Sequence, residues 1–149
     1  MSAVRLFLDT NALHDYVGGQ EPFFPAVENL IVMSVFGDVE LYISGKSYTD
    51  AFYTIKRFKN STEIQAAFIK TFEYFEVCSL ERDDIQAACE LGWPDFEDAL
   101  IAVSAKKAGA DYLITRDKRF NKTLVPIKAP EDIIEMFREQ GITYATVTL

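Results

Sequence analysis

Residues 4–11 of the chain, VRLFLDTN, contain a nearly continuous apolar run that ends at an acid. A short apolar run bounded by polar residues is typical of a strand that is buried on both faces. Such strands occur in parallel sheets that helices cover on either side. The run therefore predicts a buried first strand over residues 4–8, with Asp9 directly at its carboxyl end.

The remaining sequence alternates between strand and helix patterns. Further strands are predicted over residues 39–44, 76–80, 111–115 and 124–127, with a weak edge strand over 142–149. Helices are predicted over residues 12–17, from the Pro22–Pro25 loop to about 36, and over 46–58, 62–75, 82–91, 95–108 and 130–140. This alternation predicts a three-layer α/β/α fold around a mostly parallel sheet of four to five strands. With no repeat or linker, residues 1–149 are expected to form a single domain.

The composition is that of a folded, soluble chain. Its 149 residues are 49% hydrophobic and 26% charged, which excludes disorder and collagen-like repeats. No apolar run approaches the roughly 18 residues needed to cross a bilayer, and the first residues lack the features of a signal peptide. We therefore expect a cytoplasmic protein that does not associate with membranes. Cys78 and Cys89 belong to no CxxC motif and are expected to be reduced thiols.

The net charge of −8 argues at first sight against a nucleic-acid partner, because phosphate-binding surfaces are usually basic. The charge is unevenly distributed, however. Residues 73–98 contain nine acids and one base, whereas residues 106–122 contain six bases and two acids. The average charge is therefore a poor guide to partners.

Carboxylates from four segments are expected to meet at one edge of the sheet. Asp9 follows the first strand, and Asp50 lies in the helix after the second. Asp95, Glu97 and Asp98 begin a later helix, and Asp117 follows the strand over 111–115. Ligands of open α/β sheets bind beyond the carboxyl ends of the strands. Carboxylates that share a site repel each other unless cations lie between them, and Mg²⁺ and Mn²⁺ prefer oxygen ligands. Such ions activate water and stabilise a leaving oxygen, as phosphodiester hydrolysis requires.

Each acid also has a purely structural interpretation. Asp9 and Asp117 suit a turn or cap, Asp50 suits a solvated helix face, and Asp98 suits a helix N-terminus next to the expected cap Asp95. These alternatives remain open at the level of the sequence.

Other residues in the sequence add weaker expectations. Glu97 is expected to face outward, although it could supply an extra acid, and His14 is expected on a helix surface. Ser61 is the expected N-cap of the helix over 62–75. The aromatic residues of the two helices between 46 and 75 either pack in the core or form an exposed patch. No GxSxG, Walker or GxGxxG motif is present, so serine hydrolases, P-loop enzymes and dinucleotide enzymes have no support.

Five motifs together resemble the PIN domain family, which includes metal-dependent ribonucleases and VapC-type toxins. They are LDTN at 8–11, SYTD at 47–50, DFEDALIA at 95–102, ITRDKRF at 114–120 and IKAPED at 127–132. Their order and spacing cover essentially the whole chain. The resemblance implies a Mg²⁺- or Mn²⁺-dependent ribonuclease, the toxin of a type II toxin–antitoxin pair, with an antitoxin partner and a homodimeric state.

The resemblance also assigns roles to individual residues. It places metal-binding, catalytic acids at Asp9, Asp98 and Asp117, and at Asp50, where the family usually has Glu. Because Asp is shorter by one methylene, about 1.5 Å, Asp50 is expected to bind through water or to shift the ion. Two polar positions of the family match Asn11 and Thr115, which would orient the acids.

The basic residues divide between phosphate contacts and structural roles. Those flanking Asp117 are candidates for RNA binding, and a second group could line the other rim. The first group is Arg116, Lys118 and Arg119; the second is Lys46, Lys56, Arg57 and Lys59. Lys106 and Lys107 are expected to complement a helix dipole.

Two other functions compete with a ribonuclease. The shortened acid at Asp50 favours a catalytically weakened PIN-like module that binds RNA or protein. A phosphohydrolase with Asp9 as nucleophile would need a second Asp two residues on, where the chain has Asn11.

Overall fold

The apolar run at the N-terminus forms the central strand of a parallel sheet. In the computed structural model, which describes residues 2–117, 120 and 124–144, β1 (Val4–Leu8) lies between β2 (Val39–Ser44) and β4 (Tyr112–Ile114). The edges are β3 (Phe75–Cys78) beside β2 and β5 (Ile127–Lys128) beside β4, giving the order β3-β2-β1-β4-β5 with every pair parallel. The parallel pairing confirms the prediction, made from the apolar run over residues 4–8, of a buried strand in a parallel sheet.

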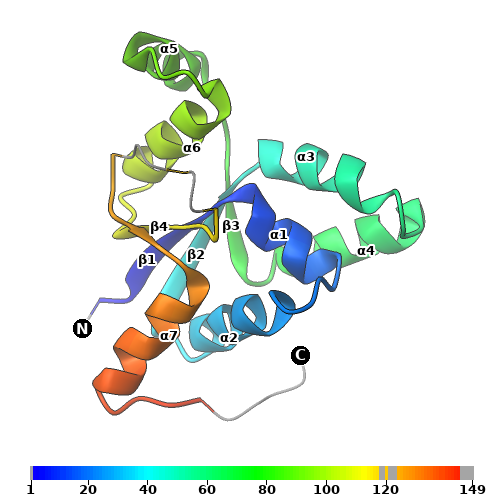
Figure 1. Cartoon of the computed structure of the whole chain (residues 1–149), viewed down its shortest axis with the longest axis vertical. Coiled ribbons are helices and arrows are strands. Elements are labelled where there is room, and N and C mark those ends of the chain that lie inside the picture. Colours follow the sequence, from blue (N-terminus) through cyan, green and yellow to red (C-terminus); the bar gives the residue numbers. More distant parts are fainter. Residues whose placement is uncertain (1, 118–119, 121–123, 145–149) are drawn as a thin grey trace.

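Helices cover both faces of this sheet. In the described residues they are α1 (Thr10–Val17), α2 (Phe24–Val35), α3 (Lys46–Ile55), α4 (Ser61–Thr71), α5 (Arg82–Leu91), α6 (Phe96–Lys107) and α7 (Pro130–Glu139). Figure 1 shows α5 and α6 together on one side of the strands, and α1, α2, α3, α4 and α7 on the other. The three-layer α/β/α prediction is therefore confirmed.

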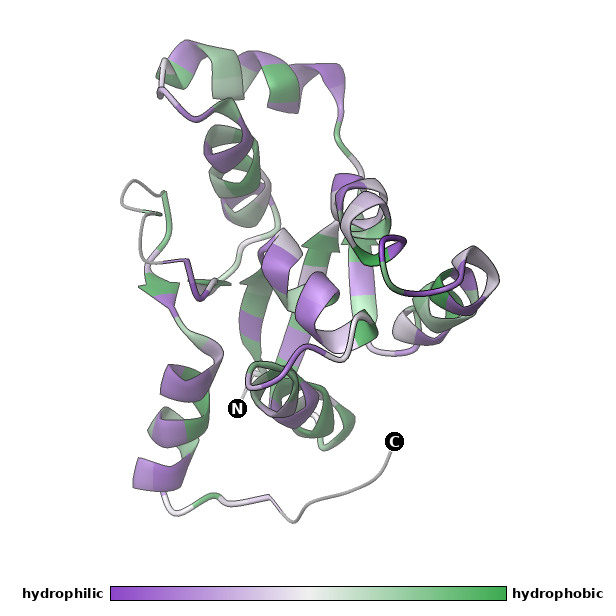
Figure 2. Ribbon diagram, turned by 45° about the vertical axis from the view of Figure 1, so that its right-hand side comes forward, coloured by the Kyte–Doolittle hydropathy of each residue, from purple (hydrophilic) through white to green (hydrophobic). Residues whose placement is uncertain are grey.

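The alternation of side chains along β1 divides the core into two parts. Leu6 and Leu8 point into the larger cluster, which includes residues of α1, α2, α3 and α7. Phe7 points the other way and packs with Ile101 of α6 and Leu113 of β4. Figure 2 shows a comparable division of side chains on α7: its hydrophobic side faces the rest of the molecule, and its hydrophilic side faces outward. Each strand of the centre is thus buried on both faces, as parallel sheets require.

Several predicted boundaries are confirmed, and others shift for local reasons. The strands over 4–8 and 39–44 and the helix over 82–91 have the predicted bounds. The first helix starts at Thr10 rather than residue 12, because the Asp9 side chain caps it. The N-cap of α4 is Asn60 rather than Ser61, since Asn60 Oδ1 accepts from the Thr62 amide at 2.8 Å. An Asn side chain one residue earlier thus satisfies the free helix amide.

The predictions for the C-terminal strands are partly wrong. The strand expected over 124–127 is found at Ile127–Lys128, where the Pro126 carbonyl just before it accepts from the Leu113 amide. Residues 142–144 form no strand; Tyr144 instead donates a hydrogen bond to Asp38 and packs on Phe36. Residues 145–149 lie outside the described residues. Within the described part of the chain, no helix is both long and apolar enough to span a bilayer.

Candidate active site

The predicted acids lie near the carboxyl end of β1, where the order of the strands reverses. From β1 the chain continues to β2 on one side of the sheet, while β4 pairs with the other side of β1. Such a switch point is where open α/β sheets bind ligands. Asp9 follows β1 and Thr115 follows β4, and the Asp9 amide donates to the Ile114 carbonyl at 2.9 Å. The site therefore begins at two strand ends that the sheet holds side by side.

The Asp9 carboxylate is fixed by three hydrogen bonds. Its Oδ1 accepts from the Thr10 amide at 2.7 Å, and its Oδ2 accepts from the Thr115 hydroxyl at 2.8 Å and the Asn11 amide group at 3.2 Å. Burial raises the pKa of Asp9, while the bonds from Thr115 and Thr10 oppose that shift. Both residues predicted to orient the acids, Asn11 and Thr115, thus contact Asp9.

The Thr115 side chain connects Asp9 to Asp117. It is 4% exposed; besides donating to Asp9, its oxygen accepts from the Asn11 side chain at 3.1 Å and from the Asp117 amide at 3.0 Å. One donor and two acceptor positions are all that a hydroxyl offers. Thr115 therefore positions two acids with its full hydrogen-bonding capacity.

Asp98 joins this group from the start of α6. Asp95 is the N-cap, as predicted, and its carboxylate accepts from the Asp98 amide at 3.1 Å. Burial raises the pKa of Asp98 to about 6, helped by the negative charges of Asp95, Asp9, Asp117 and Glu97. This repulsion places Asp98 within electrostatic reach of both Asp9 and Asp117, so acids from three distant segments share one site.

Asp50 occupies a different position at this edge. Its Oδ2 lies 2.5 Å from the Lys46 Nζ atom, which also lies 3.3 Å from Oε1 of Glu97. Burial lowers the pKa of Lys46, but the bond to Asp50 and the charge of Glu97 outweigh burial and raise it. Glu97 is exposed, as expected, and its carboxylate also pairs with Lys46, which agrees with the alternative that it supplies an extra acid at this edge.

Arg116 forms an ion pair that the sequence did not reveal. Its Nε and second guanidinium nitrogen donate to the two oxygens of Asp15 at 2.8 and 3.1 Å, and its guanidinium stacks 3.9 Å from the centre of the Phe23 ring. Asp15 is only 1% exposed. The one signal in the sequence is an acid within the apolar helix at 12–17, whose partner lies 101 residues away. As the buried acid engages two guanidinium nitrogens, Arg116 is chiefly a structural residue.

The comparison with known families decides the classification. The family model for the PIN domain matches residues 5–119. This chain belongs to the PIN domain family. The match contains the four predicted acids together with Asn11 and Thr115.

Solved structures show the same fold. One is VapBC2 from Rickettsia felis bound to a DNA fragment from its promoter, with a TM-score of 0.64, 16% identity, and coverage of 85% of this chain and 98% of that one. Another is VapC20 from Mycobacterium tuberculosis, a sarcin-ricin loop cleaving toxin, with a TM-score of 0.62, 15% identity, and coverage of 77% and 92%. PAE2754 from Pyrobaculum aerophilum has a TM-score of 0.60, 20% identity, and coverage of 92% and 97%.

At 15 to 20% identity these likenesses establish the shared fold alone. A comparison with curated proteins gives no significant match.

The donor set of this PIN domain suits a hard divalent cation. Asp9, Asp98 and Asp117 offer carboxylate oxygens, which Mg²⁺ and Mn²⁺ prefer. Among the described residues, no group of three or more His, Cys, Asp or Glu side chains is placed so as to hold a metal ion. Mg²⁺ usually keeps several waters and is bound directly by only one or two carboxylates. The residues therefore fit a hydrated ion.

Other predicted residues of the PIN domain take structural places. His14 is half-buried rather than on the surface, because Phe58 packs on its ring edge-to-face. Lys107, at the end of α6, also bonds Asp84 of α5 at 2.8 Å. Cys78 and Cys89 are free thiols, as predicted. The RNA-binding candidates Lys118 and Arg119 lie outside the described residues.

The aromatic residues of α3 and α4 divide between the two predicted roles. Tyr48 and Phe68 pack edge-to-face, with ring centres 4.9 Å apart, against the larger core cluster. Tyr53 on α3, Phe58 in the turn after it and Phe72 at the C-cap of α4 are exposed. The helix pair and its flanking turns therefore have both packed and exposed aromatic residues.

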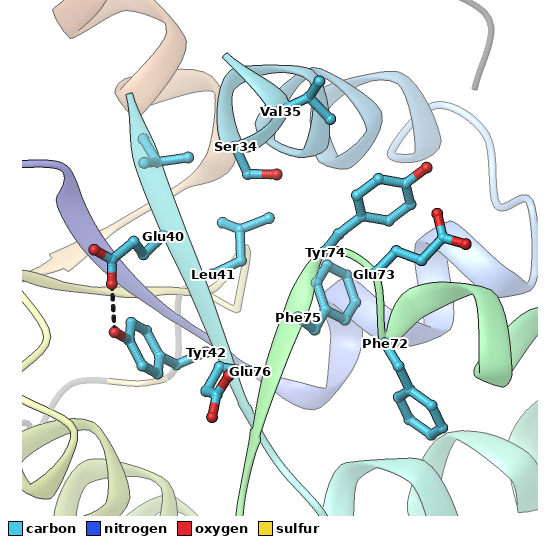
Figure 3. Close-up of a pocket in the computed structure, with 11 residues that line it drawn as sticks. Ser34, Val35, Glu40, Leu41, Tyr42, Phe72, Glu73, Tyr74, Phe75 and Glu76 are labelled. Atoms are coloured by element: carbon cyan, nitrogen blue, oxygen red, sulfur yellow. Dashed lines mark hydrogen bonds between the residues drawn. The ribbon is translucent and has the colours of Figure 1, made fainter. Parts of the chain in front are cut away.

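A cavity of about 380 Å³ lies at the other end of the sheet, near the first residues of β2 and β3. Figure 3 shows it between these two strands, with Glu40, Glu73 and Glu76 at its margins and the Tyr42 hydroxyl bonded to Glu40. None of the described residues that line it is basic or belongs to the predicted site. It is therefore separate from the acids at the carboxyl edge.

Proposed function

We propose that this PIN domain is a Mg²⁺- or Mn²⁺-dependent endoribonuclease, the toxin of a type II toxin–antitoxin pair. The observation that carries the proposal is the meeting of Asp9, Asp98 and Asp117 from three distant segments at the switch point of the sheet. Burial and, after it, repulsion from Asp95, Asp9, Asp117 and Glu97 raise the pKa of Asp98 to about 6. A cation that neutralises these acids offsets this repulsion, which gives the site its affinity for divalent ions.

The residues of the chain have distinct parts in this proposal. Asp9, Asp98 and Asp117 hold the cation, which when bound lowers the pKa of water and stabilises charge on the scissile phosphate. Thr115 and Asn11 hold the Asp9 carboxylate in one orientation, and Thr115 also fixes the backbone of Asp117. Preorganised ligands of this kind lower the cost of assembling the site.

The choice of RNA and of an antitoxin partner is supported by similar proteins. VapC20 from M. tuberculosis is a toxin that cleaves the sarcin-ricin loop, and VapBC2 from R. felis is a complex bound to promoter DNA. Their fold covers 77 to 85% of this chain. The exposed side chains of Tyr53 on α3, Phe58 after it and Phe72 at the end of α4 are apolar contacts for a second copy of the chain or for an antitoxin helix.

Cleavage of a labelled single-stranded RNA by the purified protein tests the reaction. We expect cleavage with Mn²⁺ or Mg²⁺, none with EDTA, and a loss of at least about 100-fold for Asp9→Asn and Asp98→Asn, which remove charged ligands. Asp83→Asn is the matched control, since Asp83 is an exposed acid on α5. Equal activity of folded Asp9→Asn and unaltered protein would refute the proposal.

A weakened binding module is the second candidate, because Lys46 neutralises Asp50, one of the four predicted metal ligands. This candidate predicts RNA or protein binding without turnover under every metal condition. Mn²⁺-dependent turnover that Asp98→Asn abolishes excludes it.

A further inference from the structure

The Lys46 side chain lies where the acidic edge would otherwise hold two unneutralised carboxylates. We use "acidic edge" for Asp9, Asp50, Glu97, Asp98 and Asp117. The Lys46 Nζ atom lies 2.5 Å from Asp50 and 3.3 Å from Glu97. Both contacts are within the distance of a charge-assisted bond or close to it. A cation supplied by the chain itself therefore already occupies one half of the edge.

Two helix starts hold Lys46 in this place. Lys46 is the first residue of α3, and Asp50 lies one turn later on the same face, as i and i+4 residues do. Glu97 comes from the first turn of α6. The start of α3 is tied to the rest of the site by the contact of 2.7 Å between the hydroxyls of Ser47 and Thr10, next to Asp9. The ion pair thus depends on fixed backbone positions rather than on loops.

The Lys46 ammonium group lies beside a small cavity and is also open to solvent. The cavity that Lys46, Asp50 and Glu97 share with Thr10 and Ser47 has a volume of about 10 Å³, about the room for one water molecule. The Lys46 and Glu97 side chains are 41% and 58% exposed. The positive charge of Lys46, rather than a lack of space, therefore disfavours a second cation at these two carboxylates.

The identity of residue 50 agrees with this arrangement. Asp50 is one methylene shorter than Glu, which costs about 1.5 Å of reach. Its carboxylate contacts the ammonium group one turn away and also meets the Glu97 carboxyl of α6. The positive charge at Lys46 and the short acid at Asp50 are therefore complementary.

We propose that Lys46 is an internal counter-ion that fills the Asp50–Glu97 half of the acidic edge, so that the site binds one divalent cation, at Asp9, Asp98 and Asp117, and not two. This inference rests on the proposed function for the first ion. The second half becomes a cation site only when the ammonium group is removed.

Counting bound Mn²⁺ tests this assignment without measuring activity. Titration of the full chain, followed by the paramagnetic resonance of free Mn²⁺ and by calorimetry, should give one ion per chain for the unaltered protein and two for Lys46→Met. Adding Glu97→Gln to Lys46→Met should return the count to one. Lys46→Arg, which keeps the charge, should bind one ion.

The matched control is Lys56→Met, the same change at the end of α3, where Lys56 lies over the Tyr53 ring. It should bind one ion. Lys46→Gln serves as a second removal of the charge if circular dichroism shows that Lys46→Met is not folded. Lys46 is 41% exposed, so neither change opens a core cavity.

The outcomes separate this inference from the proposed nuclease. One ion in both the unaltered protein and Lys46→Met overturns the role of Lys46 while leaving the nuclease intact. Two ions in the unaltered protein also overturn it. No ion in the unaltered protein, but one in Lys46→Met that Glu97→Gln removes, supports the counter-ion role and refutes the proposed metal site.

Discussion

Asp98 stands in the electrostatic field of several carboxylates at the acidic edge. Burial raises its pKa to about 6, and Asp95, Asp9, Asp117 and Glu97 contribute. A carboxyl with an ordinary pKa of 3.8 in the unfolded chain is therefore harder to ionise in the folded protein. The folded protein binds a proton there between about pH 4 and 6 that the unfolded chain does not bind, so stability must depend on pH in that window.

The sign of this dependence gives the first prediction. As pH rises from about 4 to about 6, the Asp98 contribution to the free energy of unfolding falls in metal-free protein, and the full cost remains above pH 6. Asp98→Asn removes this cost and should stabilise the metal-free protein at pH 7.5 by about 1 kcal/mol, since solvent screens a half-buried group.

Urea unfolding in EDTA at pH 5 and pH 7.5 measures the effect. Mn²⁺ should reverse the order at pH 7.5, because only the unaltered protein gains binding energy from the ion. An Asp98→Asn protein that is less stable than the unaltered one in EDTA at pH 7.5 would contradict the assignment of repulsion to this residue.

Sequence reasoning located single acids better than it located their partners. Asp9, Asp98 and Thr115 could be placed because strand ends and helix starts meet at one edge of a parallel sheet. The pairing of Arg116 with Asp15 and the turn of Lys46 toward Glu97 could not, since each depends on how two separate elements pack. Spacing along the chain carries no record of contacts between residues 101 or 51 positions apart.

Among the elements, α1 and the segment after β4 are joined by the Asp15–Arg116 pair. The buried carboxylate belongs to α1, and the guanidinium follows Thr115 directly. The same pair lies between the two segments that supply Asp9 and Asp117. Loss of the Asp15–Arg116 pair should therefore lower the stability of the fold more than it changes the positions of Asp9 and Asp117.

Removing the guanidinium gives the second prediction. Arg116→Met leaves Asp15 buried without its partner and should lower the free energy of unfolding by about 3 kcal/mol. Asp15→Asn combined with Arg116→Met should recover part of this loss, because no buried charge remains. Arg138→Met is the control: its pair with Glu135 on α7 is largely exposed, and its loss should cost under about 0.5 kcal/mol.

Thermal and urea unfolding of the unaltered protein and of the three variants measure these differences in the free energy of unfolding. If Arg116→Met were as stable as Arg138→Met, Arg116 would be available for phosphate instead. Reduced RNA binding with unchanged stability would then restore the role that the sequence suggested for it.

The start of α4 gives a third prediction at the scale of one helix. Asn60→Ala removes the N-cap bond to the Thr62 amide and should cost about 1 kcal/mol, whereas Ser61→Ala should cost well under half of that. Unfolding by urea compares the two. A larger loss of stability for Ser61→Ala than for Asn60→Ala would show that Ser61, the residue expected from the sequence, is the N-cap.

The elements themselves were predictable where the local signals agree. The strands over 4–8 and 39–44 are predominantly apolar runs, and the helix over 82–91 ends at Gly92, which has a positive φ of 64°. At the C-terminal end the pattern was weak. Pro126 cannot donate to a ladder, so β5 begins only at Ile127, and Tyr144 finds its partner on the segment between α2 and β2 rather than in the sheet.

For the whole molecule, the uneven charge now has a structural basis. The acidic stretch from 73 to 98 runs through β3 and α5 to the start of α6, and it ends at Asp98 of the acidic edge. Five carboxylates lie at that edge: Asp50 and Glu97 share Lys46, and the negative charges of Asp9 and Asp117 act on Asp98. A phosphate that approaches metal-free protein therefore meets net negative charge.

The last prediction follows from this charge. A divalent ion offsets two negative charges at the point where the phosphate must bind, so RNA affinity should depend on metal more than on the basic residues around it. Fluorescence anisotropy of a labelled single-stranded RNA at moderate salt should show binding at least about tenfold weaker in EDTA than in Mn²⁺, with gels confirming intact RNA. Asp98→Asn should bind equally weakly under both conditions, because it loses the ion. Tight binding in EDTA that high salt abolishes would instead assign recognition to the lysines and arginines.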